Sequence, residues 1–106
     1  MAEQELGDWT PIVGAFPSGR GSEDGYVRLD EEHPLGARVT LEDGGTTAPW
    51  SITCGLYGSM VHTAFCASEA EARAKLAAMK DRLIELALIA PGDDRYDGFR
   101  RFVDDF

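Results

Sequence analysis

The sequence has few basic residues, few cysteines and no long apolar run, and each shortage argues against a class of protein. Ten Lys and Arg residues stand against nineteen Asp and Glu residues, giving a formal net charge of −9. A protein that neutralises nucleic-acid phosphates must supply a basic patch, whereas these basic residues are scattered. We therefore expect no nucleic-acid partner. An acidic surface can attract a basic protein, or it can simply keep the chain soluble.

The two cysteines, Cys54 and Cys66, form no Cys-x-x-Cys motif and no cysteine–histidine spacing of a zinc site. No metal or other cofactor is expected. The acidic N-terminal segment lacks the apolar core of a secretory signal, which favours the cytoplasm and disfavours a disulfide framework. The longest apolar run, residues 86–90, is far shorter than the ~20 residues of a membrane span, so no membrane partner is expected.

The length of 106 residues predicts one domain with a single core. Residues 1–24 end in a stretch rich in Gly, Pro and Ser and predict an irregular N-terminal arm. Residues 25–106 predict a single α+β domain. The arm has too many apolar side chains for a disordered segment, so we expect residues 9–13 to lie along the domain as a short strand or ordered coil.

Four segments alternate apolar and polar residues, which is typical of half-buried strands: 26–32, 37–43, 50–57 and 60–67. Gly58 and Ser59 are predicted to form a two-residue type II′ turn between the last two strands. In that register Tyr57 pairs with Met60. The apolar face then receives Val61, Thr63 and Phe65, and the other face receives Met60, His62, Ala64 and Cys66.

Two helices are predicted after the strands. Ser68 and Glu71 form a capping box, and apolar residues recur at helical spacing as far as Ala90 before Pro91-Gly92 ends the helix. The tail repeats aromatic residues at about one helical turn, with Asp93 or Asp94 as a candidate cap. These aromatics, Tyr96, Phe99, Phe102 and Phe106, pack either on the same chain or on a second subunit.

Strands followed by helices predict an α+β fold. We expect a four-stranded antiparallel meander, packed on one face by the long amphipathic helix, plus the N-terminal arm and a short C-terminal helix. The predicted core is Val27, Leu29, Val39, Leu41, Trp50, Ile52, Leu56, Val61 and Phe65 against Leu76, Met79, Leu83 and Leu86.

The other face of the sheet is the main candidate for function, because its aromatic, Arg and hydroxyl side chains resemble the composition of an interface. Gly55, in the middle of a strand, indicates a bulge or a close backbone approach. This face is predicted to be a shallow groove for a ligand, a peptide or another subunit; the alternative is a hydrated face partly covered by the arm. Its candidate binding residues are Tyr26, Arg28, Arg38, Thr53, Tyr57, His62 and Cys66.

No catalytic residue is predicted. Cys54 is expected in the core as an inert thiol. His62 and Cys66 are four residues apart on one strand, hence ~13 Å, which is too far for a nucleophile and its base. His33 lies among acids in a predicted turn and has no second ligand nearby in sequence.

The sequence thus favours a non-enzymatic protein-binding or regulatory module, whose partner is another protein or a second copy in a homodimer. The alternative is a small-molecule-binding protein or small enzyme that uses the open sheet face.

Overall fold

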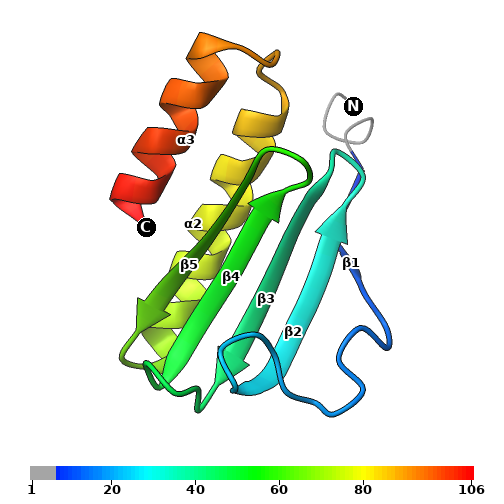
Figure 1. The fold of residues 1–106 in the computed structure, drawn as a ribbon, viewed down its shortest axis with the longest axis vertical. Coiled ribbons are helices and arrows are strands. Elements are labelled where there is room, and N and C mark those ends of the chain that lie inside the picture. Colours follow the sequence, from blue (N-terminus) through cyan, green and yellow to red (C-terminus); the bar gives the residue numbers. More distant parts are fainter. Residues whose placement is uncertain (1–6) are drawn as a thin grey trace.

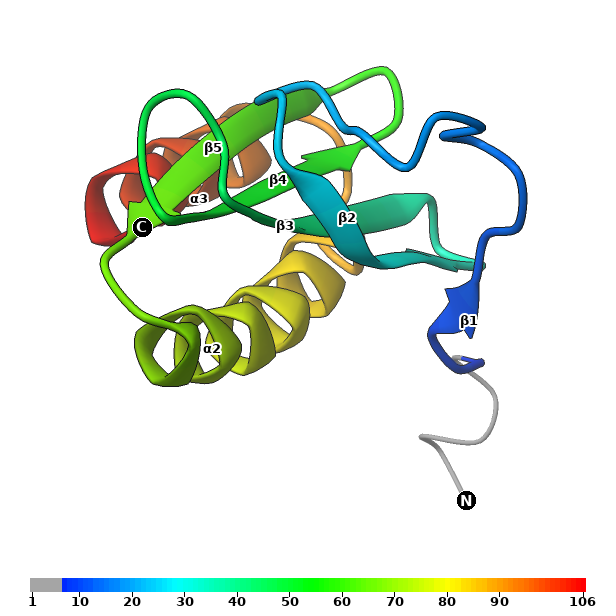
Figure 2. The same cartoon turned by 90° about the horizontal axis from the view of Figure 1, so that it is seen from below.

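The computed structural model describes residues 7–106 and shows an α+β fold, with an antiparallel sheet, the longer helix across one of its faces and the shorter helix beside it at one edge of the sheet (Figures 1 and 2). The elements are β1 Thr10–Pro11, β2 Tyr26–His33, β3 Ala37–Asp43, β4 Trp50–Leu56, β5 Met60–Cys66, α2 Glu69–Ala87 and α3 Asp93–Asp105. The strand order is β1-β2-β3-β4-β5. The prediction of four strands is corrected to five, since part of the arm forms β1 and pairs with β2.

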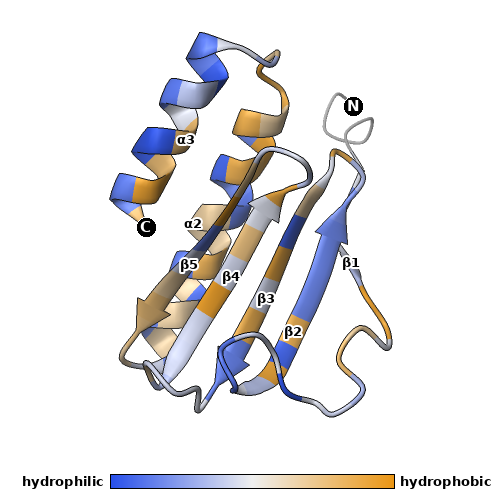
Figure 3. Ribbon diagram, in the orientation of Figure 1, coloured by the Kyte–Doolittle hydropathy of each residue, from blue (hydrophilic) through white to orange (hydrophobic). Residues whose placement is uncertain are grey.

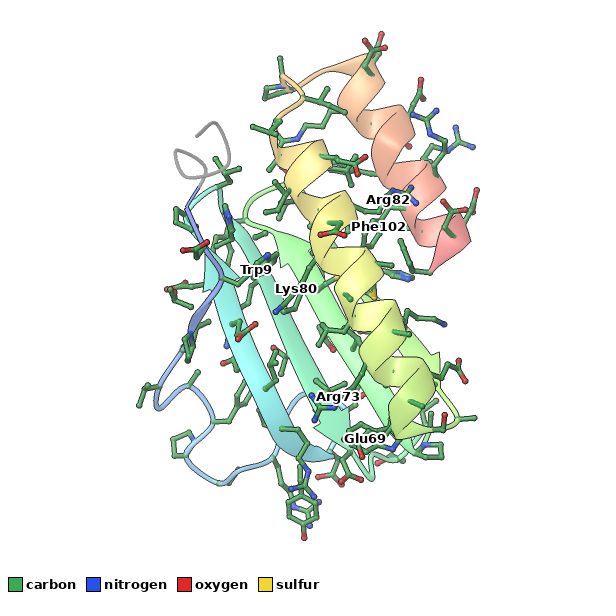
Figure 4. All side chains as sticks on the ribbon, turned by 180° about the vertical axis from the view of Figure 1, so that it is seen from behind. Trp9, Glu69, Arg73, Lys80, Arg82 and Phe102 are labelled. Atoms are coloured by element: carbon green, nitrogen blue, oxygen red, sulfur yellow. The ribbon has the colours of Figure 1, made fainter. Side chains whose placement is uncertain are left out.

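The segment around β1 is fastened to the molecule by aromatic and charged contacts. The ring of Trp9 meets the buried ring of His33 edge-on, with centroids 5.4 Å apart. Lys80 of α2 contacts Glu31 and also lies 5.2 Å from the centroid of Trp9 (Figure 4). The expectation that residues 9–13 lie along the domain is confirmed.

Helix α2 begins where the capping box predicts. Ser68 Oγ accepts a hydrogen bond from the backbone N–H of Glu71 (3.2 Å), and the Glu71 carboxylate accepts one from the N–H of Ala67 (3.3 Å). The helix ends at Ala87, before the predicted end at Ala90. Its buried stripe, Ala72, Leu76, Met79, Leu83 and Leu86, packs against the sheet face that we call the inner face.

Helix α3 packs beside α2 on the β5 side of the molecule (Figures 1 and 2). Its N-cap is Gly92 without a side-chain hydrogen bond, so the predicted aspartate cap is wrong. A Cβ at the buried Gly98 would lie 2.5 Å from Leu86 Cδ2, which explains how the two helices approach so closely. Phe102 is fully buried within the chain, near Arg82 (Figure 4), while Tyr96 is 61% exposed.

The β4–β5 hairpin differs from the sequence prediction by one residue. Leu56 pairs with Met60, which makes a three-residue loop. Gly58 has φ +75°, and Ser59 N–H donates to Leu56 O at 3.0 Å, so Gly58 is the second central residue of the turn. The predicted two-residue turn, with Gly58 first, is therefore wrong.

A slip of one residue exchanges the two faces of a strand. Met60, His62, Ala64 and Cys66 face the helices, whereas Val61, Thr63 and Phe65 lie on the opposite face, which we call the outer face. The prediction that Val61 and Phe65 belong to the core is wrong, since they are 79% and 43% exposed. The buried apolar residues of the sheet are Ala37, Val39, Leu41, Ile52, Cys54, Leu56, Ala64 and Cys66.

Strand β2 contains a second irregularity. Val27 pairs with Glu42 and Leu29 with Leu41, with a β-bulge at Arg28 between them. Val27 and Leu29 therefore do not share the inner face, contrary to the prediction, because the bulge adds a residue to one strand only. Along β3 and β4 the alternation of hydrophobic and hydrophilic residues is regular (Figure 3).

The two registers of β5 predict opposite effects for a pair of lysine substitutions. Ala64→Lys should lower the free energy of unfolding by about 3 kcal/mol or more, because a charge would be placed in the core. Val61→Lys should change it by less than about 0.5 kcal/mol. Urea unfolding of both variants, at a concentration at which wild type is monomeric, tests this. The reverse order of stability would instead support the two-residue turn.

Candidate functional site

A loop crosses part of the outer face. Residues 12–25, which we call the strap, run over the sheet on the side opposite the helices (Figure 2). The Arg38 guanidinium lies 5.6 Å from the centroid of the Phe16 ring, and Ser22 Oγ lies 3.5 Å from Thr53 Oγ1. Thr40, Glu42 and Ser51 of the outer face are buried, whereas Val61 and Phe65 of β5 are exposed. The strap therefore leaves the β5 side of the outer face open.

Glu42 anchors the strap. Its side chain is fully buried, and its carboxylate accepts hydrogen bonds from the backbone N–H groups of Glu23 and Gly25, each at 3.1 Å. A Cβ at Gly21 would lie 2.4 Å from Glu42 Cδ, so only glycine lets the chain pass this close. Hydrogen bonds to a buried carboxylate are among the strong ones, and they hold the loop against the sheet.

Removing this anchor should loosen the strap and lower the stability of the whole protein. We expect Glu42→Ala to lower the free energy of unfolding by about 2–4 kcal/mol, because the buried N–H of Gly25 and the partly buried N–H of Glu23 lose their acceptor. Hydrogen exchange at Glu23 and Gly25 should accelerate. Glu32→Ala, at an exposed position of β2, is the control and should cost less than about 0.5 kcal/mol. Equal effects of the two substitutions would contradict the anchoring role.

An open groove of about 520 Å³ lies beside the strap, at the hairpin end of the sheet. We call it the outer groove; Arg38, Thr40, Thr53, Gly55, Tyr57 and Val61 belong to its lining. A Cβ at Gly55 would lie 2.7 Å from Met60 O, which confirms the predicted close backbone approach at this position.

Arg38 is held in a fixed geometry at one wall of the outer groove. Its Nε and Nη2 donate to the two carboxylate oxygens of Asp30 at 2.9 and 2.7 Å, and Thr40 Oγ1 donates to the same carboxylate at 3.1 Å. The hydrogen bond to Asp30 raises the pKa of the Arg38 side chain. Because Asp30 is buried and neutralises this charge, Arg38 acts as an oriented hydrogen-bond donor more than as a free cation.

Three of the seven predicted binding residues, Arg38, Thr53 and Tyr57, lie together at the outer groove. Tyr26 and Arg28 lie at the other end of the sheet, because Tyr26 pairs with Asp43 far from the hairpin loop. Arg20 stacks on the Tyr26 ring, and Arg28 forms an ion pair with Asp43 at 2.8 Å. A binding role for these five residues stays a prediction.

His62 and Cys66 do not belong to this surface, and their predicted placement on the outer face is wrong. The corrected register turns both toward the helices, where the His62 ring meets Phe102 edge-on with centroids 6.1 Å apart. Burial raises the pKa of the Cys66 thiol, and it raises the pKa of Cys54 to about 12. Both thiols are therefore protonated near neutral pH and poor nucleophiles. The prediction that Cys54 lies in the core is confirmed.

His33 has a structural role. Its Nε2 lies 3.1 Å from Gly7 O, and its Nδ1 accepts a hydrogen bond from Leu35 N–H at 3.1 Å. Across residues 7–106, no three His, Cys, Asp or Glu side chains are grouped so that they could hold a metal ion. Neither helix of this part of the chain is long and apolar enough to cross a membrane.

No protein-family model, curated protein or solved structure matches this chain. Functional inference therefore depends on the geometry of the site.

Val61 and Phe65 are surface residues that were not predicted as such from the sequence. Alternation alone shows that they share a face, but the length of the turn decides which face it is. The residue types of Ala64 and Cys66 favour the observed register, since small apolar side chains are suited to packing under a helix.

The raised pKa of Cys54 predicts a loss of stability at alkaline pH. Above pH 9.0, its ordinary pKa, the unfolded thiol ionises, whereas the folded thiol keeps its proton up to about pH 12. The free energy of unfolding should therefore fall by about 1.4 kcal/mol more between pH 8 and 10 in wild type than in Cys54→Ala. Urea unfolding under reducing conditions measures this difference, and parallel pH profiles would contradict it.

Proposed function

We propose that this chain is a protein-binding module that recognises its partner through the open part of the outer face. We call this surface the binding face; it consists of the outer groove and the exposed side chains of Tyr57, Val61 and Phe65. The observation that carries the proposal is their exposure, 58%, 79% and 43%, on one side of the sheet. Exposed aromatic and aliphatic side chains next to polar groups are typical of interaction sites.

The distribution of charge supports the same proposal. The chain carries a formal net charge of −9, yet Arg38 is the one ionisable side chain of the binding face that bears a charge at neutral pH, and Asp30 neutralises it. Interface centres are depleted of charged residues, because each unpaired charge costs free energy when it is desolvated. On this acidic protein, the binding face is thus a surface that a partner can cover with little loss of free energy from the desolvation of charges.

The groove chemistry favours binding over catalysis. Covalent catalysis needs a nucleophile within about 3 Å of a base. The hydroxyl groups of Thr40 and Thr53 lie in the groove without a neighbouring histidine, and the Cys54 thiol points into the core on the far side of the sheet. A volume of about 520 Å³ lies within the range of small-molecule sites, which favours small-ligand binding as the second candidate.

Selection of peptides tests the proposal and does not require the partner to be identified first. The wild-type chain is immobilised at low density, so that copies do not meet, and is used to select from a displayed peptide library. We expect peptides that bind wild type and the Val13→Lys variant equally but lose about tenfold or more in affinity for Val61→Lys. Val13 is a matched control, because it is 92% exposed and lies on the strap.

Failure to obtain any peptide sensitive to Val61→Lys would contradict protein binding through this face. A fragment screen by NMR covers the second candidate. Shifts confined to Thr53, Gly55 and Tyr57, in the absence of peptide binders, would support a small-ligand site in their place.

A further inference from the structure

Strand β5 is an unprotected edge of the sheet. Within residues 7–106 it pairs with β4 alone, and it contains neither proline nor an Asp, Glu, Lys or Arg residue. Edge strands normally avoid pairing with other chains through charged side chains, proline, bulges, short length or a covering helix. Helix α3 lies beside the start of β5, at Met60 and His62, and leaves the rest of this edge open (Figure 1). Seven residues of a regular, largely apolar strand therefore offer unpaired backbone groups to another strand.

The opposite edge of the sheet has the protection that β5 lacks. There β1 is only two residues long and includes Pro11, and the neighbouring β2 carries Asp30, Glu31 and Glu32 in succession. Figure 3 shows this contrast between the mostly hydrophilic β2 and the more hydrophobic β5. Because one edge is blunted and the other is not, association through the sheet is directed to β5.

Helix α3 provides a surface beneath a strand added at this edge. A second groove, of about 450 Å³, lies between the start of β5 and α3, and Met60, Tyr96, Phe99 and Val103 supply its apolar lining. Tyr96 and Val103 are 61% and 45% exposed. Since α3 flanks the β5 side of the molecule (Figure 1), a strand placed beside β5 would cover these side chains as well.

We propose that the partner is a second copy of this chain, which pairs its β5 antiparallel to β5 about a two-fold axis at Thr63. The inference rests on the proposed function, because it names the partner that contacts the Val61 and Phe65 part of the binding face. In this arrangement Val61 lies opposite the partner's Phe65, and Thr63 lies opposite the partner's Thr63. The two sheets would join into one continuous sheet across the two-fold axis.

The outer face of β5 is self-complementary in this register. An aliphatic β-branched residue opposite an aromatic residue and a Thr–Thr pair are both favourable cross-strand pairs. The second pair would extend a row already present in the chain, where Thr40 pairs with Thr53 and Thr53 with Thr63, the last two hydroxyls being 3.3 Å apart. An antiparallel pair about a two-fold axis also closes the assembly at two copies.

The distribution of charge also favours association through β5. Two chains of net charge −9 repel each other unless they meet where acidic residues are absent. β5 carries no acidic residue, whereas at the opposite edge the exposed Glu32 of each copy would approach the other. The charges on β5 itself therefore oppose a second copy less than the charges at the other edge do.

Mass in solution, measured by light scattering over a range of concentrations, tests the pairing. Wild type should show twice the chain mass and dissociate on dilution. Val61→Lys and Phe65→Glu should each weaken the dimer by about tenfold or more, because each change acts twice in a symmetric interface. The double variant places a lysine at position 61 opposite a glutamate at position 65 of the other copy, and it should recover most of the loss. Val13→Lys should match wild type.

A wild-type chain that is monomeric at every concentration would overturn the pairing. A dimer that the double variant fails to restore would overturn the register about Thr63. Hydrogen exchange of the β5 amides at high and low concentration gives the same answer without substitution, and protection independent of concentration would also overturn the pairing. If wild type is monomeric but still selects peptides that are sensitive to Val61→Lys, the pairing is overturned and the protein-binding function is retained. If wild type is monomeric and selects no such peptide, both proposals are overturned.

Discussion

The turn from Leu56 to Ser59 is the constraint on which the rest of the molecule depends. Gly58 adopts a positive φ as its second central residue, and this fixes a three-residue loop. The parity of β5 follows from that loop, so the turn decides which side chains meet the helices and which meet solvent. With a shorter loop, the outer face would present His62 and Cys66 and bury Val61. The chemical character of the surface is therefore set by one backbone conformation.

The sequence was sufficient for those parts of the fold that are specified locally. The capping box at Ser68, the periodic stripe of α2 and the alternation of β3 and β4 each depend on neighbours within a few residues, and each was predicted. The predicted class, α+β with an antiparallel sheet and helices on one face, follows from these elements. The two-residue β1 was expected only as a short strand or ordered coil along the domain; its pairing with β2 was not predicted, since it depends on contacts distant in sequence.

The candidate site was predictable only in part, because some of its residues are placed by the local pattern of a strand and others by the length of a turn. Arg38, Thr53 and Tyr57 lie on strands whose parity is unambiguous, and they meet at the outer groove. His62, Cys66 and Val61 lie beyond the turn, where a choice between two loop lengths reverses every assignment. The anchoring of the strap by Glu42 has no sequence signal, because its partners are backbone N–H groups that every residue except proline provides.

The way Glu42 holds the strap has a consequence for how this surface can vary. The carboxylate binds main-chain groups, so the attachment does not depend on which side chains occupy positions 22 and 23. Substitutions there can alter the charge and shape of the strap while the glycines at positions 21 and 25 keep it in place. The strap can thus diversify like the loops of a recognition domain, with its main chain held to a constant frame.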